Sequence, residues 1–179
     1  MINRIFWDID ETLIHTCLQD PCQEHISFAA GEDLNMYYTI VRPCAKKLIE
    51  FSRQIVGADK VHILTTSTRE YAQKISELAG WGFKNEDIFA REDLAIHCRS
   101  VKTAWGGSRE EYDPHIYAHK DNILIDNLMP RYNERKIGFI GIWKSFNNYF
   151  KARDYYGVNF PDDSFEEEVV GFIKTRNKE

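Results

Sequence analysis

The stretch INRIFWDIDETLIH, residues 2–15, decides the fold predicted for this chain of 179 residues. Residues 2–7 form a short apolar-rich run that stops abruptly at Asp8. A run of this kind predicts a buried β-strand that carries polar residues at its C-terminal end. Asp8, Asp10 and Thr12 are therefore expected where this first strand ends.

Three later apolar runs predict further buried strands. They are residues 61–64 (VHIL), 122–125 (NILI) and 137–142 (IGFIGI), and residues 88–90 predict a shorter strand. Two of the runs lead directly into polar side chains, because VHIL is followed by Thr65 and NILI by Asp126. The pattern of the first strand is thus repeated twice.

Amphipathic helices are predicted between and after these strands. The first begins at Arg42-Pro43 and ends at Gly57, since proline suits a first helical turn and glycine a helix end. The second is expected to begin at a capping box of Ser67 and Glu70. Its inward face would hold Ala72, Ile75, Leu78 and Ala79 before Gly80. The third begins near Ser164 and would bury Phe165, Val169, Phe172 and Ile173.

Strands that alternate with amphipathic helices indicate βαβ units, so the predicted class is α/β, a three-layer α/β/α sandwich with a central parallel sheet. The length fits one domain over residues 1–179. We expect no large cap domain, only a small flap at about residues 16–41 that contacts substrate. Residues 36–41 (MYYTIV) predict a strand there, which could form a hairpin with residues 26–29.

Composition excludes several classes of protein. Lys and Arg number 23 against 28 Asp and Glu, and the net charge of −5 argues against a protein that mainly neutralises nucleic-acid phosphates. The hydrophobic content of 43% excludes a disordered chain. No apolar stretch is long enough to span a membrane, and the first residues lack the shape of a signal peptide. A cytoplasmic protein with reduced thiols is the expectation.

The four cysteines, Cys17, Cys22, Cys44 and Cys98, are scattered along the chain. One alternative is a zinc site made of His15, Cys17, Cys22 and His25, which lie close in sequence. Structural zinc sites usually come as paired knuckles with tighter spacing. We therefore favour four ordinary thiols.

Ligands of a parallel sheet bind beyond the carboxyl ends of its strands, so Asp8, Asp10, Thr65 and Asp126 are expected around one crevice. Crowded carboxylates repel one another, and a divalent cation relieves the repulsion. A small set of oxygen ligands that leaves room for water and phosphate is typical of Mg²⁺. A lone D-x-D is common as a turn or surface feature, and it is the combination of strand ends that indicates a site.

The spacing of Asp8 and Asp10 separates their tasks. If the chain turns after Asp8, the backbone carbonyl of Asp10 can face the metal while its side chain reaches the reacting group. One carboxylate is then available for nucleophilic attack and the other for proton transfer. The Thr65 hydroxyl and the amides that open the helix at Ser67 would form an anion cradle. Lys102 and Lys120 are both candidates for offsetting phosphate charge.

Several motifs of this chain resemble those of a known family. They are D-I-D-E-T-L-I-H at residues 8–15, an aromatic-rich strand before Arg42-Pro43, L-T-T-S at residues 64–67 followed by Tyr71-Ala72, and I-D-N at residues 125–127 followed by Pro130. Over roughly residues 2–145 the chain resembles the haloacid-dehalogenase-like phosphohydrolases. Its nearest likeness there is to the small NLI-interacting-factor-like phosphatases, which act on the carboxy-terminal domain of RNA polymerase II.

The resemblance implies a role for each matching residue. Asp8 would be nucleophile and metal ligand, Asp10 general acid and then base, and Asp126 a further metal ligand, with Asp10 completing the metal set. Thr12 would steady the turn, Thr65 would bind the transferring phosphoryl group, and Thr66 and Ser67 would contact substrate. Lys102 fits the sequence context of the family's lysine better than Lys120, although the segment from Lys102 to Asp126 is longer than the family's.

The predicted function is a Mg²⁺-dependent phosphomonoesterase that works through an aspartyl phosphate. A phosphoserine or phosphothreonine protein is the expected substrate, and a nucleotide or polynucleotide 3′-phosphate is the alternative. A catalytically inactive binding scaffold of the same fold is the alternative of another class. The partner is therefore a phosphorylated substrate, with nucleic acid less favoured and no membrane expected.

Overall fold

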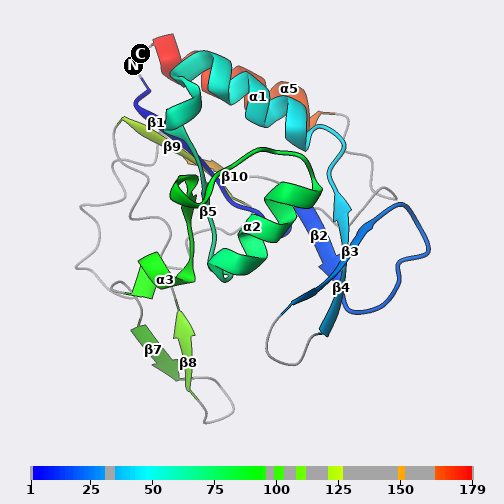
Figure 1. Ribbon diagram of the computed structural model, residues 1–179. Helices are drawn as coiled ribbons and strands as arrows, with labels where there is room; N and C mark the ends of the chain where they lie inside the picture. The colour runs from blue at the N-terminus through cyan, green and yellow to red at the C-terminus, as the bar shows by residue number, and fades with distance from the viewer. Residues whose placement is uncertain are drawn as a thin grey trace.

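The computed structural model describes residues 2–30, 35–95, 99–102, 108–111, 121–126, 149–151 and 164–178 (Figure 1). The strand predicted at residues 137–142 lies outside the described residues, as do Lys120 and Asn127. Among the residues described, no helix is long and apolar enough to cross a bilayer.

A parallel sheet of five strands forms the centre of the molecule, in the order β10-β9-β1-β5-β6. Its strands are β1 (Arg4–Trp7), β5 (Val61–Leu64), β6 (Ile88–Phe89), β9 (Asn122–Asp126) and β10 (Tyr149–Lys151). All four neighbouring pairs are parallel, which confirms the predicted sheet. In the register, Trp7 lies opposite both Ile63 and Ile125. The residues that follow these three positions therefore emerge side by side at one edge of the sheet.

Helices flank both faces of this sheet, as predicted. The helices α1 (Ala45–Val56), α2 (Arg69–Leu78) and α5 (Phe165–Lys178) share one core with Ile5, Trp7, Ile63 and Ile125. Figure 1 shows α1 and α5 packed side by side. Side chains alternate between the faces of a strand, and Phe6, Leu64 and Leu124 accordingly pack on the opposite face with Leu94 of α3 (Arg91–Leu94). Short 3₁₀ turns, η1 (Ala58–Lys60) and η2 (Asn85–Asp87), precede β5 and β6.

The helix boundaries correct part of the sequence prediction. Gly57 closes α1 as predicted, with φ of 99° and its N–H donating to the Arg53 carbonyl. The capping box predicted for α2 is wrong, because Thr68 is the N-cap and its hydroxyl accepts the N–H of Tyr71. Leu78 is 41% exposed instead of buried, since it borders a pocket at the end of α2.

The remaining predicted core positions of the helices are mostly confirmed. Ala72 and Ile75 of α2 are fully buried. In α5, Phe165, Val169 and Ile173 are buried, while Phe172 is only half-buried. These positions recur at the spacing of one helical face, which is why the sequence pattern found them.

The flap is a separate antiparallel sheet of three strands, in the order β2-β4-β3. It contains β2 (Ile14–Cys17), β3 (Ile26–Ala30) and β4 (Asn35–Val41). The hairpin of β3 and β4 confirms the prediction, whereas the sequence did not reveal β2. A further hairpin of β7 (Arg99–Lys102) and β8 (Ser108–Glu111) was also not predicted, and it forms its own two-stranded sheet.

Candidate active site

A tight turn follows β1 and shapes the candidate site. The carbonyl of Ile9 accepts the N–H groups of Thr12 and Leu13 at 3.2 and 2.8 Å. Glu11 adopts the left-handed conformation with φ of 59°, which lets the chain reverse there. The turn brings the Thr12 hydroxyl back to Asp8, where it donates to Oδ2 at 2.8 Å. Thr12 is completely buried, so its hydroxyl holds the rotation of the Asp8 carboxylate.

Asp8 and Asp126 form a pair of neighbouring carboxylates at the ends of β1 and β9. The Asp8 N–H donates to the Ile125 carbonyl at 3.0 Å, which continues the strand pairing up to the site. Desolvation raises the pKa of Asp8 well above its usual value, and the negative charges of Asp126 and then Asp10 raise it further. The Thr12 hydrogen bond acts in the opposite direction. The carboxylates of Asp8 and Asp126 are therefore held close together at the buried ends of β1 and β9.

This donor set fits Mg²⁺. Asp8 and Asp126 offer carboxylate oxygens only, which are the ligands that Mg²⁺ prefers, and their mutual repulsion favours a bound cation. In the part of the chain that the structure describes, no three His, Cys, Asp or Glu side chains gather into a metal-binding group. Two carboxylates with remaining positions for water and phosphate are nevertheless sufficient for Mg²⁺, which usually keeps several waters.

The two histidines considered for zinc have other partners. His15 Nδ1 lies 2.8 Å from a carboxylate oxygen of Glu11, and His25 Nδ1 lies 2.6 Å from the carbonyl of Gln23. Cys17 and Cys22 are free thiols. These contacts tie the two histidines to their own turns instead of to a shared centre.

Asp10 is held by two hydroxyl groups from the start of α2. Ser67 Oγ donates to its Oδ2 and the Tyr71 hydroxyl donates to its Oδ1, each at 2.8 Å. Desolvation raises the pKa of Asp10, while the hydrogen bonds from Tyr71 and Ser67 lower it. The pKa of the Tyr71 hydroxyl is itself raised, first by burial and then by the charge of Asp10. Asp8 and Asp10 thus have different partners at the end of the same strand.

No function of Tyr71 could be predicted from the sequence, where this residue is only part of the motif that follows Thr65. Tyr71 lies on α2, more than one helical turn beyond the strand end at Thr65. No local pattern indicates that its hydroxyl meets Asp10. Only the packing of α2 against the sheet brings them together.

The segment after β5 contributes Thr65, Thr66 and Ser67. Thr65 is 1% exposed, and its hydroxyl oxygen accepts the Ser67 N–H at 3.1 Å. The N–H of Arg69, the first residue of α2, donates to the Glu92 carboxylate at 3.2 Å. The N–H groups of Ser67 and Arg69, which were expected in the anion cradle, therefore donate hydrogen bonds to other groups of the protein. Among the described groups, the backbone N–H of Thr66 has no hydrogen-bond partner.

The backbone of Lys102 forms the last residue of β7, and Figure 1 shows the β7–β8 hairpin below α3. The assignment of the lysine to Lys102 or to Lys120 stays a prediction.

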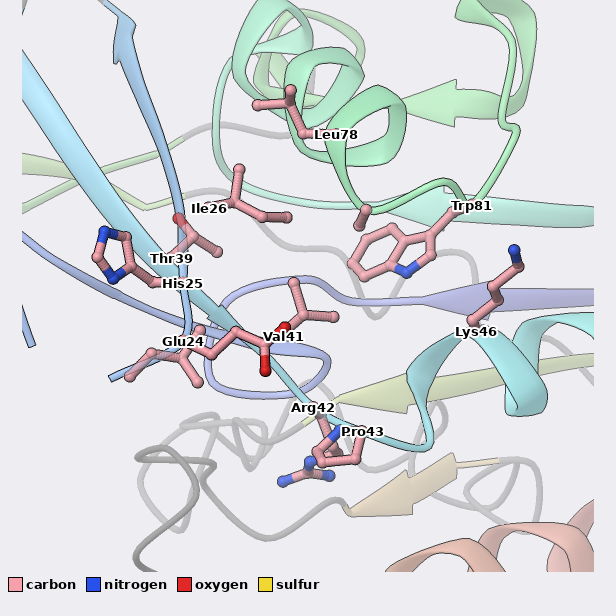
Figure 2. A pocket seen from close by; sticks show the side chains of 12 residues that line it. Glu24, His25, Ile26, Thr39, Val41, Arg42, Pro43, Lys46, Leu78 and Trp81 are labelled. Atoms are coloured by element: carbon pink, nitrogen blue, oxygen red, sulfur yellow. The ribbon is translucent and has the colours of Figure 1, made fainter. Parts of the chain in front are cut away.

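A pocket of about 400 Å³ lies on another side of the flap (Figure 2). It is bounded by the flap strands, the start of α1 and the end of α2. Its lining includes Ile26, Thr39, Val41, Lys46, Leu78 and Trp81, and it contains none of the predicted catalytic residues. The pocket and the strand-end cluster are therefore separate features of the surface.

Comparison with known structures supports the fold. A variant of fission yeast Fcp1, an RNA polymerase II CTD phosphatase, bound to beryllium fluoride, aligns with a TM-score of 0.50 and 15% identity over 99% of this chain and 51% of that chain. Another structure of Fcp1, described as an essential RNA polymerase II CTD phosphatase, gives a TM-score of 0.47 and 16% identity over 99% of this chain and 49% of that one. The chain spans about half the length of these solved chains.

Sequence comparison defines the family. No curated protein sequence matches the chain significantly. The model of a family described as NLI interacting factor-like phosphatase, however, matches residues 4–175, nearly the whole chain and every strand and turn of the site described above. The chain therefore belongs to the NLI interacting factor-like phosphatase family.

Proposed function

We propose that this protein is a Mg²⁺-dependent phosphomonoesterase that forms an aspartyl phosphate on Asp8 and acts on phosphoserine or phosphothreonine in a protein. The observation that supports it best is the division of partners between two carboxylates at one strand end. Asp8 is fixed by Thr12 beside Asp126, whereas Asp10 is held by Ser67 and Tyr71. Asp8 lies beside a second carboxylate, which suits a metal ligand and nucleophile, whereas Asp10 lies beside hydroxyl donors, which suits a proton-transfer role.

In the first half-reaction, a carboxylate oxygen of Asp8 attacks phosphorus. The bond between phosphorus and the ester oxygen breaks, and the departing oxygen takes a proton from the Asp10 carboxyl. Asp10 is left as a carboxylate that accepts hydrogen bonds from Ser67 and Tyr71. Desolvation raises the pKa of Asp10, which favours the protonated form that this step needs.

In the second half-reaction, Asp10 acts as a base. Its carboxylate removes a proton from a water molecule as the water oxygen attacks phosphorus. The bond between phosphorus and the Asp8 oxygen breaks, which releases inorganic phosphate and returns Asp8 as a carboxylate. Asp10 ends the cycle protonated, so protons and charges balance over the two steps.

Asp8 and Asp126 would hold Mg²⁺, with the backbone carbonyl of Asp10. When bound, Mg²⁺ supplies positive charge that offsets the phosphoryl oxygens and the repulsion between the carboxylates. The Thr65 hydroxyl and the Thr66 N–H are the polar groups of the β5 segment that we assign to the phosphoryl group. A lysine, Lys102 or Lys120, would add a further positive charge.

A protein substrate is favoured for three reasons. The described chain places only the small β2-β4-β3 sheet between β1 and α1, and a small flap suits phosphate carried on a macromolecule. The net charge of −5 disfavours a polynucleotide. The solved structure of similar fold with a TM-score of 0.50 is of an RNA polymerase II CTD phosphatase, which is the relevant precedent for a phosphoprotein.

A substrate panel tests the proposal. Phosphopeptides, nucleotides, 3′-phosphorylated oligonucleotides and p-nitrophenyl phosphate are assayed with Mg²⁺ and with EDTA. We expect Mg²⁺-dependent turnover of p-nitrophenyl phosphate and faster turnover of a phosphopeptide. If a nucleotide or oligonucleotide is fastest, the substrate class is wrong, and if nothing is hydrolysed at any mildly acidic to neutral pH, the protein is a scaffold.

The intermediate is tested with Asp10→Asn. With p-nitrophenyl phosphate the leaving group departs with little help, so Asp8 should still be phosphorylated while hydrolysis lacks its base. Rapid acid quench and mass spectrometry should find added phosphate on the peptide that carries Asp8. Asp8→Asn should abolish turnover and this label together. Phosphate on a serine, cysteine or histidine instead would refute the mechanism.

A further inference from the structure

A chain of hydroxyl groups runs from the flap to Asp10. Thr39 of β4 and Thr16 of β2 face each other across the flap sheet, and their Oγ1 atoms lie 3.0 Å apart. The Thr16 hydroxyl lies 2.9 Å from the Tyr71 hydroxyl, and Tyr71 donates to Asp10 Oδ1 at 2.8 Å. Segments far apart in sequence are thus joined to one catalytic carboxylate by consecutive hydrogen bonds.

The direction of this chain follows from proton counting. A hydroxyl group has a single hydrogen to donate. Tyr71 uses its hydrogen on Asp10, so Thr16 must donate to Tyr71. Thr16 has then used its own hydrogen, so Thr39 must donate to Thr16. Every hydrogen bond therefore points toward the carboxylate, and hydrogen bonds aligned in this way polarise and strengthen one another.

Packing fixes the positions of these hydroxyls. Thr39 is completely buried. The ring of Tyr71 contacts Phe28 of β3 and Tyr37 of β4, with ring centroids 5.8 and 6.0 Å apart. The flap therefore holds Tyr71 both through its ring and through its hydroxyl. Ser67 reaches only the other oxygen, Oδ2, so the flap acts on one side of the Asp10 carboxyl.

We propose that Tyr71 is a positioning residue for Asp10, and that Thr16 and Thr39 extend this function into the flap. The flap then does more than border the substrate, because its placement sets the rotation of the group that transfers protons. This inference rests on the proposed function, in which Asp10 is the acid and then the base.

The test compares substrates whose leaving groups need different amounts of protonation. Tyr71→Phe removes the hydroxyl and keeps the ring. Losing a hydrogen bond to a charged group typically costs about tenfold or more. We expect the single-turnover rate constant for phosphorylation of Asp8 by an alkyl or phenyl phosphate to fall by about that factor, and the same rate constant for p-nitrophenyl phosphate to fall far less.

Thr16 supplies the matched variants. Thr16→Val should shift the ratio of the Asp8 phosphorylation rate constants for the two substrates in the same direction as Tyr71→Phe. Thr16→Ser should give the wild-type ratio because it keeps the hydroxyl. The double variant Tyr71→Phe with Thr16→Val should be no worse than Tyr71→Phe alone, since the two residues act in one chain. Tyr37→Phe, in the same aromatic cluster, should leave the ratio at the wild-type value.

The outcomes separate this inference from the proposed function. If the wild-type protein hydrolyses none of the substrates, the proposed function fails first. If the wild type is active and Tyr71→Phe lowers the rate constant for phosphorylation of Asp8 equally with both substrates, with an unchanged melting temperature, the positioning role is refuted. An equal loss in Thr16→Val and Thr16→Ser would likewise overturn the hydroxyl chain.

Discussion

Replacing Asp126 by asparagine should stabilise the protein in the absence of metal. Asp126 is 2% exposed and stands at the end of β9, beside Asp8 at the end of β1. The negative charge of Asp126 is one of the causes that raise the pKa of Asp8. Asp126→Asn keeps the shape of the side chain and removes the charge. The repulsion between the two carboxylates should disappear with it.

The strand geometry sets the magnitude. Neighbouring strands lie about 4.8 Å apart, and two unit charges about 5 Å apart repel by about 3 kcal/mol at an effective dielectric constant of about 20. Desolvation and the charge of Asp126 both raise the pKa of Asp8, so proton uptake opposes the repulsion in the wild type and the net effect is smaller than this value. We expect a net gain of about 1–2 kcal/mol in the free energy of unfolding, or about 2–8 °C in melting temperature.

Thermal and urea unfolding in EDTA and in Mg²⁺ measure this effect. Mg²⁺ that binds only the folded wild type stabilises it, so the advantage of Asp126→Asn should shrink or reverse when Mg²⁺ is added. Asp121→Asn is the matched control, because Asp121 is exposed and precedes the opposite end of the same strand. If Asp126→Asn is no more stable than Asp121→Asn in EDTA and responds equally to Mg²⁺, the paired-carboxylate site is refuted.

Two further predictions concern the lysine and a buried histidine. Lys102→Ala should lower kcat about a hundredfold if Lys102 contacts the phosphoryl group, while Lys120→Ala stays nearly silent; the reverse pattern would assign the role to Lys120. His62 is 6% exposed, and its ring packs between those of Phe6 and Phe89. Burial lowers the pKa of His62, and the positive charge of Arg4 lowers it further. The negative charges of Asp87 and Asp59 have smaller, opposite effects. The unfolded state therefore binds more protons than the folded state as pH falls below about 6.5, so the free energy of unfolding should fall there. In urea unfolding, His62→Phe should lose less of this free energy over the same pH range.

The central sheet could be predicted from the sequence because its signals are local. A short apolar run that ends in polar residues needs no partner to be recognised, and β5 and β9 lie where VHIL and NILI predicted them. Helix α1 could be found in the same way from its amphipathic pattern and from Gly57 at its end. The order and register of the strands then placed Asp8 and Asp126 together, as the topology of parallel sheets requires.

In the flap, one strand pairing could be predicted from the local sequence and another could not. The strands β3 and β4 form a hairpin between neighbouring segments, and the sequence predicted that pairing. Strand β2 is four residues long and exists because it pairs with β4, from which it is separated by the whole of β3. Strand propensity is set largely by such cross-strand packing, so the sequence of β2 alone did not reveal it.

Ser67 and Tyr71 make the same distinction within the site. The sequence predicted that Asp8 and Thr65 stand at strand ends, because each follows an apolar run directly, and that Asp10 and Thr12 come just after Asp8. The sequence also predicted that Ser67 caps the following helix, because its position before that helix suits this local interaction. In the structure, Thr68 is the N-cap of α2, and the hydroxyls of Ser67 and Tyr71 donate to Asp10. A serine hydroxyl can also bond to neighbouring backbone groups, and only the packing of α2 against the turn after β1 brings the hydroxyls of Ser67 and Tyr71 to Asp10.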